Sequence, residues 1–238
     1  MKKKLQGVFL SMTVFTVLTL CGIIFAQVTP ALADERADAQ QLVENAKFTL
    51  QNLLADSNMG VLRDLMKEAK GVFIIPQLLR GAYVIGLSGG NGVLLTKDRG
   101  NKWNGPAFYS IGGASIGLQI GGEASEVVLV IMTERGVNAF LANTLKFGAD
   151  ANVAVGPVGM GISAQSANLS GDILSFSRSK GLYGGVSLQG AVVATRDGLN
   201  RAYYKEKIES PADILINSNV SNPQAAGLLE EVAKSARK

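Results

Sequence analysis

Apolar residues recur with two different spacings along the chain, and the first spacing is helical. Steps of three and four residues separate the apolar positions within residues 34–54 and again within residues 59–70. This spacing places apolar side chains on one face of a helix, so two amphipathic helices are predicted, the second capped by Asp56 or Ser57. We expect both helices to cover the core. Docking on a membrane is the alternative, which the mixed charges of the polar face disfavour.

Beyond Gly71 the spacing changes to two, which is typical of strands. Short strands are predicted at 72–75, 82–87, 93–95, 115–125, 127–132, 153–155, 160–164 and 172–177. Pro76 ends the first of them, and Asn91-Gly92 is a tight-turn signal. The segment 127–132 is apolar throughout, which predicts a central strand covered on both faces.

A glycine-studded run follows a short cationic turn at residues 177–181. Numbering parity places apolar residues such as Leu188 on one face of a strand and polar residues such as Gln189 on the other. Three glycines lie between residues 182 and 195, where each would permit a bulge or a bend. One curved strand is therefore predicted over this range.

Further helices are predicted at the centre and at the C-terminus of the chain. Thr133 can cap a helix whose apolar stripe runs from Val137 to Leu145. Pro211 and Pro223 each follow a polar residue, as the first position of a helix often does. Glycine-rich runs of similar texture occupy the intervening strands. Together these elements predict an α+β fold, a curved antiparallel sheet or incomplete barrel with flanking N-terminal, central and C-terminal helices.

The N-terminal segment has the features of an export signal. Lys2 to Lys4 precede an apolar run at residues 8–26, and Ala31-Leu32-Ala33 matches a cleavage site. We expect residues 1–33 to be a secretory signal peptide and residues 34–238 to form a single domain. The alternative is an uncleaved membrane anchor, because the apolar run approaches the length of a membrane span.

Removal of that signal would leave a nearly neutral chain. It carries three of the 23 basic residues and none of the 19 acidic residues, so 20 basic residues would face 19 acidic ones. A net charge of +1 gives no global argument for nucleic acid as a partner. The only cysteine, Cys21, would also be lost, so no disulfide is expected.

The composition excludes most catalytic chemistry. The sequence contains no histidine, and without Cys21 it offers neither a Ser-His-Asp triad nor a cysteine nucleophile nor the usual ligands of zinc. Glu123 and Glu126 lie on opposite faces of a strand by parity, so they are not expected to flank one substrate. We therefore expect no catalytic residue, no metal, no cofactor and no enzymatic activity.

Two features could bind a ligand or a surface. The turn at residues 177–181 combines two hydroxyls, a guanidinium and an ammonium, which would suit a phosphate headgroup, although a solvated hairpin turn has the same composition. Trp103, the only tryptophan, lies in a polar loop. It could enter a bilayer interface or pack against its own loop.

Three segments in this order resemble the SYLF domain family: 69–76 (AKGVFIIP), 117–123 (GLQIGGE) and 177–188 (SRSKGLYGGVSL). Residues of similar type in that family match Trp103 with Pro106, 156–159 (GPVG), and Asn200 with Tyr203-Tyr204. The likeness covers about residues 43–216, and the signal peptide and a C-terminal helix at about 222–236 lie outside it.

The resemblance implies a non-enzymatic domain that binds membrane lipids. Eukaryotic relatives bind phosphoinositides and in some cases actin, using a basic amphipathic N-terminal helix and neighbouring SH3 or FYVE modules. The N-terminal helices predicted here are charge-balanced and no such module is apparent, so neither phosphoinositide selectivity nor actin binding is expected. An exported single-domain form resembles the bacterial branch of the family, in which lipid binding in the envelope is the expectation.

These observations lead to one hypothesis and two rivals. We expect a periplasmic or envelope domain that docks on anionic phospholipid, with Trp103 at the membrane interface. The residues expected to contact the headgroup are Arg178, Lys180, Ser177, Ser179, Lys70 and Arg80. The rivals are a structural or protein-interaction module of the envelope and a lipid carrier with an internal apolar cavity.

Overall fold

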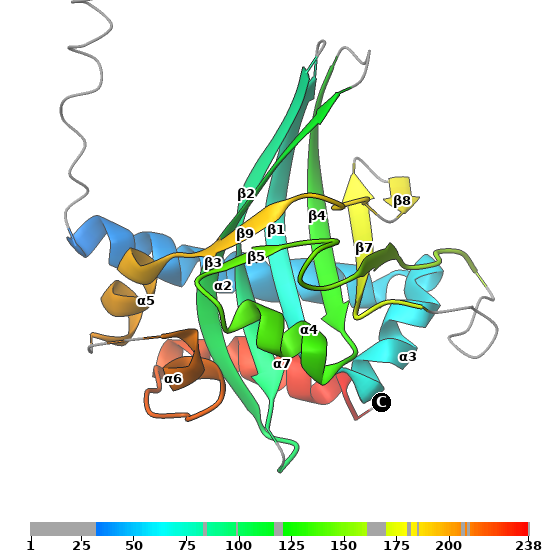
Figure 1. The fold of residues 1–238 in the computed structure, drawn as a ribbon. Coiled ribbons are helices and arrows are strands. Elements are labelled where there is room, and N and C mark those ends of the chain that lie inside the picture. The colour runs from blue at the N-terminus through cyan, green and yellow to red at the C-terminus, as the bar shows by residue number, and fades with distance from the viewer. Residues whose placement is uncertain are drawn as a thin grey trace, which may run out of the picture.

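In the computed structural model, helices pack around one bent sheet whose longest strands extend beyond them at one end (Figure 1). The structure describes residues 32–82, 85–98, 100–116, 121–160, 170–179, 182–184, 186–205, 208 and 210–237. Residues 1–31 of the predicted export signal, most of the strand predicted at 160–164 and Lys180 lie outside the described residues.

The strands form a single sheet with the order β5-β9-β3-β2-β1-β4-β7-β6, and β8 pairs with β7. Their bounds are β1 Gly71–Ala82, β2 Ile85–Lys97, β3 Trp103–Ile116, β4 Gly121–Ile131, β5 Thr144–Lys146, β6 Val153–Val155, β7 Ile173–Ser179, β8 Leu182–Gly184 and β9 Val192–Thr195. Every pairing is antiparallel except the one between β6 and β7. The predicted α+β fold with a curved sheet is confirmed.

The helical elements are α2 Leu32–Ala55, η1 Ser57–Met59, α3 Gly60–Glu68, α4 Glu134–Phe140, α5 Asp197–Tyr204, α6 Pro211–Leu215, η3 Pro223–Ala225 and α7 Ala226–Ser235. Helix α2 packs against β1, β2 and β4, and α6 and α7 pack against β3. The N-terminal helices cover the core, as the apolar spacing predicted.

The predicted helix starts are largely confirmed. Thr133 caps α4 by accepting a hydrogen bond from the Gly136 amide at 3.0 Å, and Pro211 begins α6 behind the capping residue Ser210. Asp56 caps η1, one turn ahead of α3. The central helix is shorter than predicted, because residues 144–146 leave the helical path and pair with β9.

The first two strands are longer than the sequence indicated. Pro76 does not end β1, because the register of β1 against both neighbours shifts around it, and this bulge accommodates a residue that has no N–H to donate. Asn91-Gly92 forms no turn. A Cβ at Gly92 would lie 2.7 Å from the Phe73 ring, so the glycine permits close packing of two strands. The prediction of short strands and tight turns here was wrong.

Two predicted single strands are divided in the structure. Residues 115–125 belong to β3 and β4, which lie on opposite sides of the β1–β2 pair. Residues 182–195 contribute β8, which pairs with β7, and β9, which pairs with β3 and β5. Residues 186–191 carry the chain between these two sides of the sheet, and we call them the crossing segment. Parity cannot reveal a crossing, because each piece separately keeps an alternating pattern.

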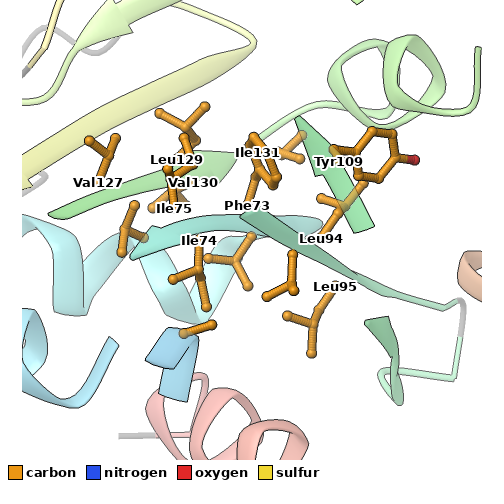
Figure 2. Packing of buried hydrophobic residues seen from close by; sticks show 14 of the residues in the cluster. Phe73, Ile74, Ile75, Leu94, Leu95, Tyr109, Val127, Leu129, Val130 and Ile131 are labelled. Atoms are coloured by element: carbon orange, nitrogen blue, oxygen red, sulfur yellow. The ribbon is translucent and has the colours of Figure 1, made fainter. Parts of the chain in front are cut away.

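The core lies at one end of the four long strands. Figure 2 shows buried side chains of β1, β2, β3 and β4 that project from both faces of the sheet. Phe73 contacts Tyr109 and Phe140 edge to face, with ring centroids 5.9 and 5.3 Å apart. Residues 127–131 are fully buried, which confirms the central strand covered on both faces. We call this part of the long strands the covered end.

Beyond the covered end the same strands leave the helical layer and extend past it (Figure 1). We call residues 78–82, 85–90, 112–116 and 121–125 the free end of the sheet. Here β7 no longer pairs with β4, and β9 reaches β3 only as far as Gly112. Leu78 and Ser125 at its base are still buried, but Leu79 and Leu87 on one face and Glu123 on the other are exposed.

Candidate functional site

A groove lies where the concave face of the free end meets the crossing segment. Its volume is about 620 Å³, within the range of about 300–1,000 Å³ that is typical of ligand sites. It is lined by Arg80, Gly81, Gly86, Leu87, Ser88, Gly113, Ala114, Gly121, Gly122, Glu123, Ser187, Leu188, Gln189 and Ala191. Side chains far apart in the sequence thus meet in one hollow.

Arg80 is the basic residue of this groove. It lies on β1 directly opposite Ser88 of β2 and Glu123 of β4, so all three side chains share the concave face. The Arg80 Nη2 atom donates a hydrogen bond of 3.1 Å to the Ser187 carbonyl oxygen. A guanidinium has five N–H donors, so Arg80 retains capacity to bind an anionic oxygen.

Glu123 gives the groove a second charge. Its Oε1 atom accepts a hydrogen bond of 3.1 Å from the Ser125 hydroxyl. The groove therefore combines one guanidinium, one carboxylate, hydroxyls and the Gln189 amide with apolar side chains such as Leu188. Such a lining can hold a polar headgroup.

Arg178 does not lie in the groove. Its Nε atom donates a hydrogen bond of 2.7 Å to the Glu126 carboxylate, and its Nη2 atom forms an ion pair with the same oxygen. Glu126 also accepts a hydrogen bond from Thr49 of α2, at 3.3 Å, so the pair lies on the helix side of the sheet. Arg178 therefore links β7, β4 and α2.

The residues around Arg178 form a strand in place of the predicted cationic turn. Ser177, Arg178 and Ser179 belong to β7, so successive side chains point to opposite faces. Ser177 is buried. The structure thus separates the two serines from Arg178, and a phosphate nest built from all three is not formed. Lys180 lies outside the described residues.

Lys70 lies at the covered end, far from Arg80. It precedes β1 by one residue, and its Nζ atom pairs with Glu134 at 2.9 Å. Ten positions separate it from Arg80 along an extended strand, which corresponds to roughly 30 Å. Lys70 and Arg80 therefore cannot contact the same headgroup.

Trp103 also lies at the covered end, opposite Lys97. Its side chain is 5% exposed, and the Lys97 Nζ atom lies 5.1 Å from the ring centroid. Partial burial, with a smaller contribution from Lys70, lowers the pKa of Lys97. The indole packs within its own part of the sheet, so in this conformation it does not reach a surface where it could meet a membrane.

Asp172 is a carboxylate whose hydrogen bonds lower its pKa. It accepts from the Thr133 hydroxyl at 2.7 Å and from the Asn152 amide at 3.1 Å. These two bonds, with Arg135 nearby, hold the pKa of Asp172 below its ordinary value. Its partners belong to connections between elements, so its role is structural.

Three buried tyrosines are also structural. Burial raises the pKa of Tyr109, Tyr203 and Tyr204 above the ordinary value. Tyr109 donates to the Phe140 carbonyl oxygen at 2.8 Å, and Tyr204 donates to the Pro106 carbonyl oxygen at 2.9 Å. These hydroxyls therefore remain protonated donors that tie helices to the sheet.

Sequence reasoning identified Arg80 but missed its surroundings. Ser88, Ser187 and Gln189 were not singled out, and Glu123 was considered only as a catalytic acid. The pairing of Glu123 with Arg80 could have been predicted. If β1 is assumed to continue through Pro76, its antiparallel register with β4 places Arg80 opposite Glu123. The crossing segment left no such signal.

Two searches bear on other site types. The described residues contain no group of three or more His, Cys, Asp or Glu side chains that could hold a metal ion. Within the same ranges, no helix combines the length and the hydropathy of a bilayer-spanning helix.

Comparison with known proteins identifies the family. A family model described as "Ysc84: Las17-binding protein actin regulator" matches residues 112–236, more than half of the chain. This match includes the groove strand β4 and the crossing segment as well as α7.

Curated relatives agree with this match. "LAS seventeen-binding protein 3" of Saccharomyces cerevisiae is 27% identical over 194 residues, which are 80% of this chain and 42% of the relative. "SH3 domain-containing YSC84-like protein 1" is 31% identical over 173 residues in Bos taurus, 72% of this chain and 50% of the relative. The human protein of that name is 31% identical over 168 residues, 70% of this chain and 48% of the relative. The chain spans about half the length of the relatives it matches, and it belongs to the SYLF (Ysc84) family.

Proposed function

We propose that this protein is a non-enzymatic domain that docks on anionic phospholipid through the groove at the free end of the sheet. The observation that carries the proposal is the position of Arg80 in a solvent-accessible groove of ligand size, opposite the crossing segment. A guanidinium can bind a phosphate through two parallel hydrogen bonds, which suits it to a lipid headgroup.

The position of the groove supports a lipid surface as the source of that phosphate. The groove lies at an end of the sheet that extends past the helices, where a flat surface can approach it. Leu188 and Ala191 line it together with Arg80, so polar and apolar groups meet at one site as they do at a bilayer interface. Membership of the SYLF family agrees with this proposal, because the resemblance to that family implies a domain that binds lipids.

The proposed docking is weak and sensitive to salt. Each basic side chain near an anionic membrane surface contributes about 1 kcal/mol. Glu123 lines the same groove and offsets part of the positive potential. A free inorganic phosphate would gain only the Arg80 contact, whereas a vesicle surface adds the apolar contacts around it.

Sedimentation with vesicles tests the proposal. We expect the protein to sediment with vesicles of anionic phospholipid at low salt and to be released as salt rises. Arg80→Gln should weaken binding by about fivefold, which corresponds to about 1 kcal/mol. Arg201→Gln, at an exposed arginine of α5, is the matched control and should bind like the parent protein.

Two results would contradict the proposal. Equal and negligible sedimentation with anionic and neutral vesicles at low salt would remove lipid docking altogether. Equal losses in the Arg80→Gln and Arg201→Gln variants would show that overall charge acts, and the groove would then have no special role. Competition by inorganic phosphate separates a free-anion site from a lipid site, because only a free-anion site would be fully blocked by it.

The proposed location is the periplasm or cell envelope, and it rests on the sequence of residues 1–33. Mass spectrometry of the exported protein should give a chain that starts at Asp34. A chain that retains residues 1–33 in the membrane fraction would favour the uncleaved anchor instead.

A protein partner is the second candidate function. The family description and the name of the yeast relative both refer to Las17 binding. A pull-down whose partners persist after Arg80→Gln, together with no vesicle binding, would favour an interaction module. Actin binding is not part of the proposal, and co-sedimentation with filamentous actin is the direct check of that expectation.

A further inference from the structure

The face of the free end that points away from the groove is apolar and exposed. Because side chains alternate across a strand, the neighbours of Arg80, Ser88 and Glu123 point to this opposite side. They are Leu79, Gly81, Leu87, Gly89, Gly122 and Ala124, with Gly112 and Ala114 opposite them on β3; the main chain of Gly81, Leu87, Ala114 and Gly122 also borders the groove from the other side of the sheet. We call these eight residues the outer face. Leu79 is 53% exposed and Leu87 is 65% exposed.

None of the described elements covers the glycines of the outer face. A Cβ built on Gly81 would meet no atom within 4 Å. On Gly89, Gly112 or Gly122 the nearest atom would be a backbone oxygen of the sheet itself, at 3.8 Å. The surface is therefore smooth and open. It continues toward α2, where Phe48 is 56% exposed and lines a small hollow together with Ala124.

None of the eight residues of the outer face is charged. Between Gly81 and Gly122 the sequence contains four charged residues, Lys97, Asp98, Arg99 and Lys102. Lys97, Asp98 and Lys102 lie in or next to the connection from β2 to β3, at the covered end, and Arg99 falls outside the described residues. Arginines appear again where the outer face ends: Arg178 beside Glu126, and Arg196, which donates to the Asn91 side chain at 3.1 Å.

We infer that the outer face lies against the acyl-chain boundary of a phospholipid bilayer while the groove faces the headgroups. This inference rests on the proposed function and names the surface that would add apolar contact to it. The occupant is lipid because a bilayer requires an apolar surface without charges, and the outer face meets that requirement. A protein interface would draw on aromatic and arginine anchors, and the eight residues include neither.

The sheet edges limit how deeply the free end enters. At the free end, β3 and β4 form the two edges of the sheet. β9 pairs with β3 only as far as Gly112 and β7 pairs with β4 only from Glu126, so within the described residues these edges have no neighbouring strand. Unpaired backbone groups are costly in hydrocarbon, so these edges stay at the hydrated headgroup level. The insertion is therefore shallow, with Leu79 and Leu87 as its apolar contacts.

Site-specific fluorescence tests the inference. In a Cys21→Ser background, Leu87→Cys and Ile216→Cys each carry an environment-sensitive fluorophore on one introduced thiol. Ile216 is 47% exposed and follows Leu215, whose carbonyl oxygen accepts from Thr96 near the covered end, so it reports on the opposite end of the molecule. With anionic vesicles, the label at 87 should shift to shorter wavelength and be quenched by spin-labelled acyl chains. The label at 216 should do neither.

Two substitutions at one glycine should change vesicle binding in opposite directions. Gly89 belongs to the outer face and does not line the groove. Gly89→Asp should lower vesicle binding by about tenfold, whereas Gly89→Leu should raise it by about tenfold, the effect of one further Leu against lipid. Asn138→Asp, on the exposed side of α4, adds the same charge elsewhere and should leave binding unchanged.

The outcomes separate this inference from the proposed function. If the parent protein sediments with vesicles but the label at 87 stays in water, the inference is wrong and the groove proposal stands. If the parent protein does not sediment at all, both are wrong. A shift of the label at 87 that depends on protein concentration without vesicles would assign the outer face to a second copy of the chain, which also overturns the inference.

Discussion

The two ends of the same four strands differ in composition, and the difference indicates what each end does. At the covered end, β1 and β4 carry large apolar residues on both faces, such as Phe73 on one and Val128 on the other, and all are buried. At the free end the same strands carry mostly glycine, alanine and serine, with Leu79 and Leu87 exposed. Burial of apolar area dominates folding, so the covered end holds the fold together and the free end is available for binding.

Core truncation should give the largest contrast between the ends. Phe73→Ala removes a ring in contact with Tyr109 and Phe140 and should lower the free energy of unfolding by about 3–5 kcal/mol. Leu87→Ala, at a side chain that is 65% exposed, should change it by less than about 0.5 kcal/mol. Urea denaturation measures both variants. Similar losses would mean that the free end also supports the fold.

Glycine substitutions sharpen the same contrast with the smallest possible side chain. A Cβ at Gly92 would lie 2.6 Å from the Ile74 carbonyl oxygen and 2.7 Å from the Phe73 ring, so Gly92→Ala should cost about 1–3 kcal/mol. At Gly81 a Cβ would meet nothing, and Gly81→Ala should stabilise by about 0.4–1 kcal/mol through a less flexible unfolded chain. Thermal melting of the two variants should move in opposite directions.

Arg178 and Arg80 show the same contrast, because the first should affect stability and the second should affect vesicle binding. The Arg178 and Glu126 side chains are 26% and 25% exposed, so Arg178→Gln should cost about 1–2 kcal/mol, between the values of surface and buried ion pairs. Its vesicle binding, measured below the denaturation range, should stay within about twofold. Arg80→Gln should show the reverse, with unchanged stability and weakened vesicle binding. If Arg178→Gln abolished vesicle binding in a folded protein, the headgroup site would belong on β7.

Lowering the pH should have the smallest effect on the free energy of unfolding, and the effect should come from the covered end. Hydrogen bonds from Thr133 and Asn152 lower the pKa of Asp172, so the folded state favours its ionised form. The resulting stability is present above the ordinary pKa of about 4 and is lost as pH falls through the lower folded pKa. Asp172→Asn should remove this part of the pH dependence. Denaturation of both proteins between about pH 5 and pH 2 checks it, and identical slopes would exclude Asp172 as the cause.

Local patterns in the sequence were sufficient for most of the covered end. Helical spacing located α2 and α3, Thr133 marked the start of α4, and the unbroken apolar run at 127–132 identified β4 as a central strand. Each of these three predictions depends on residues that are close in the sequence or on a strand that is buried on both faces. A single sequence carries that information directly.

The candidate site depended on contacts that local patterns do not contain. Parity cannot say which strand lies next to which, so the division of residues 182–195 between β8 and β9 was invisible, and with it the groove. Pro76 suggested a break where the structure has a bulge, and this concealed that Lys70 and Arg80 lie at opposite ends of one strand. The sequence therefore indicated which residue types could bind a ligand, but it did not indicate which of those residues lie together.

The crossing segment has a mechanical consequence for the sheet it spans. Ser175 Oγ donates to the Val186 carbonyl oxygen at 2.7 Å and accepts from the Val186 amide at 3.1 Å, which fastens the segment to β7. Near its other end, Gly190 donates to the Phe147 carbonyl oxygen at 2.9 Å, and Phe147 donates to the Ala191 carbonyl oxygen at 2.9 Å. Because hydrogen bonds fix the crossing segment at both of its ends, it holds the two sides of the bent sheet at a fixed separation. It opposes flattening, so the width of the groove is set by the length of these few residues.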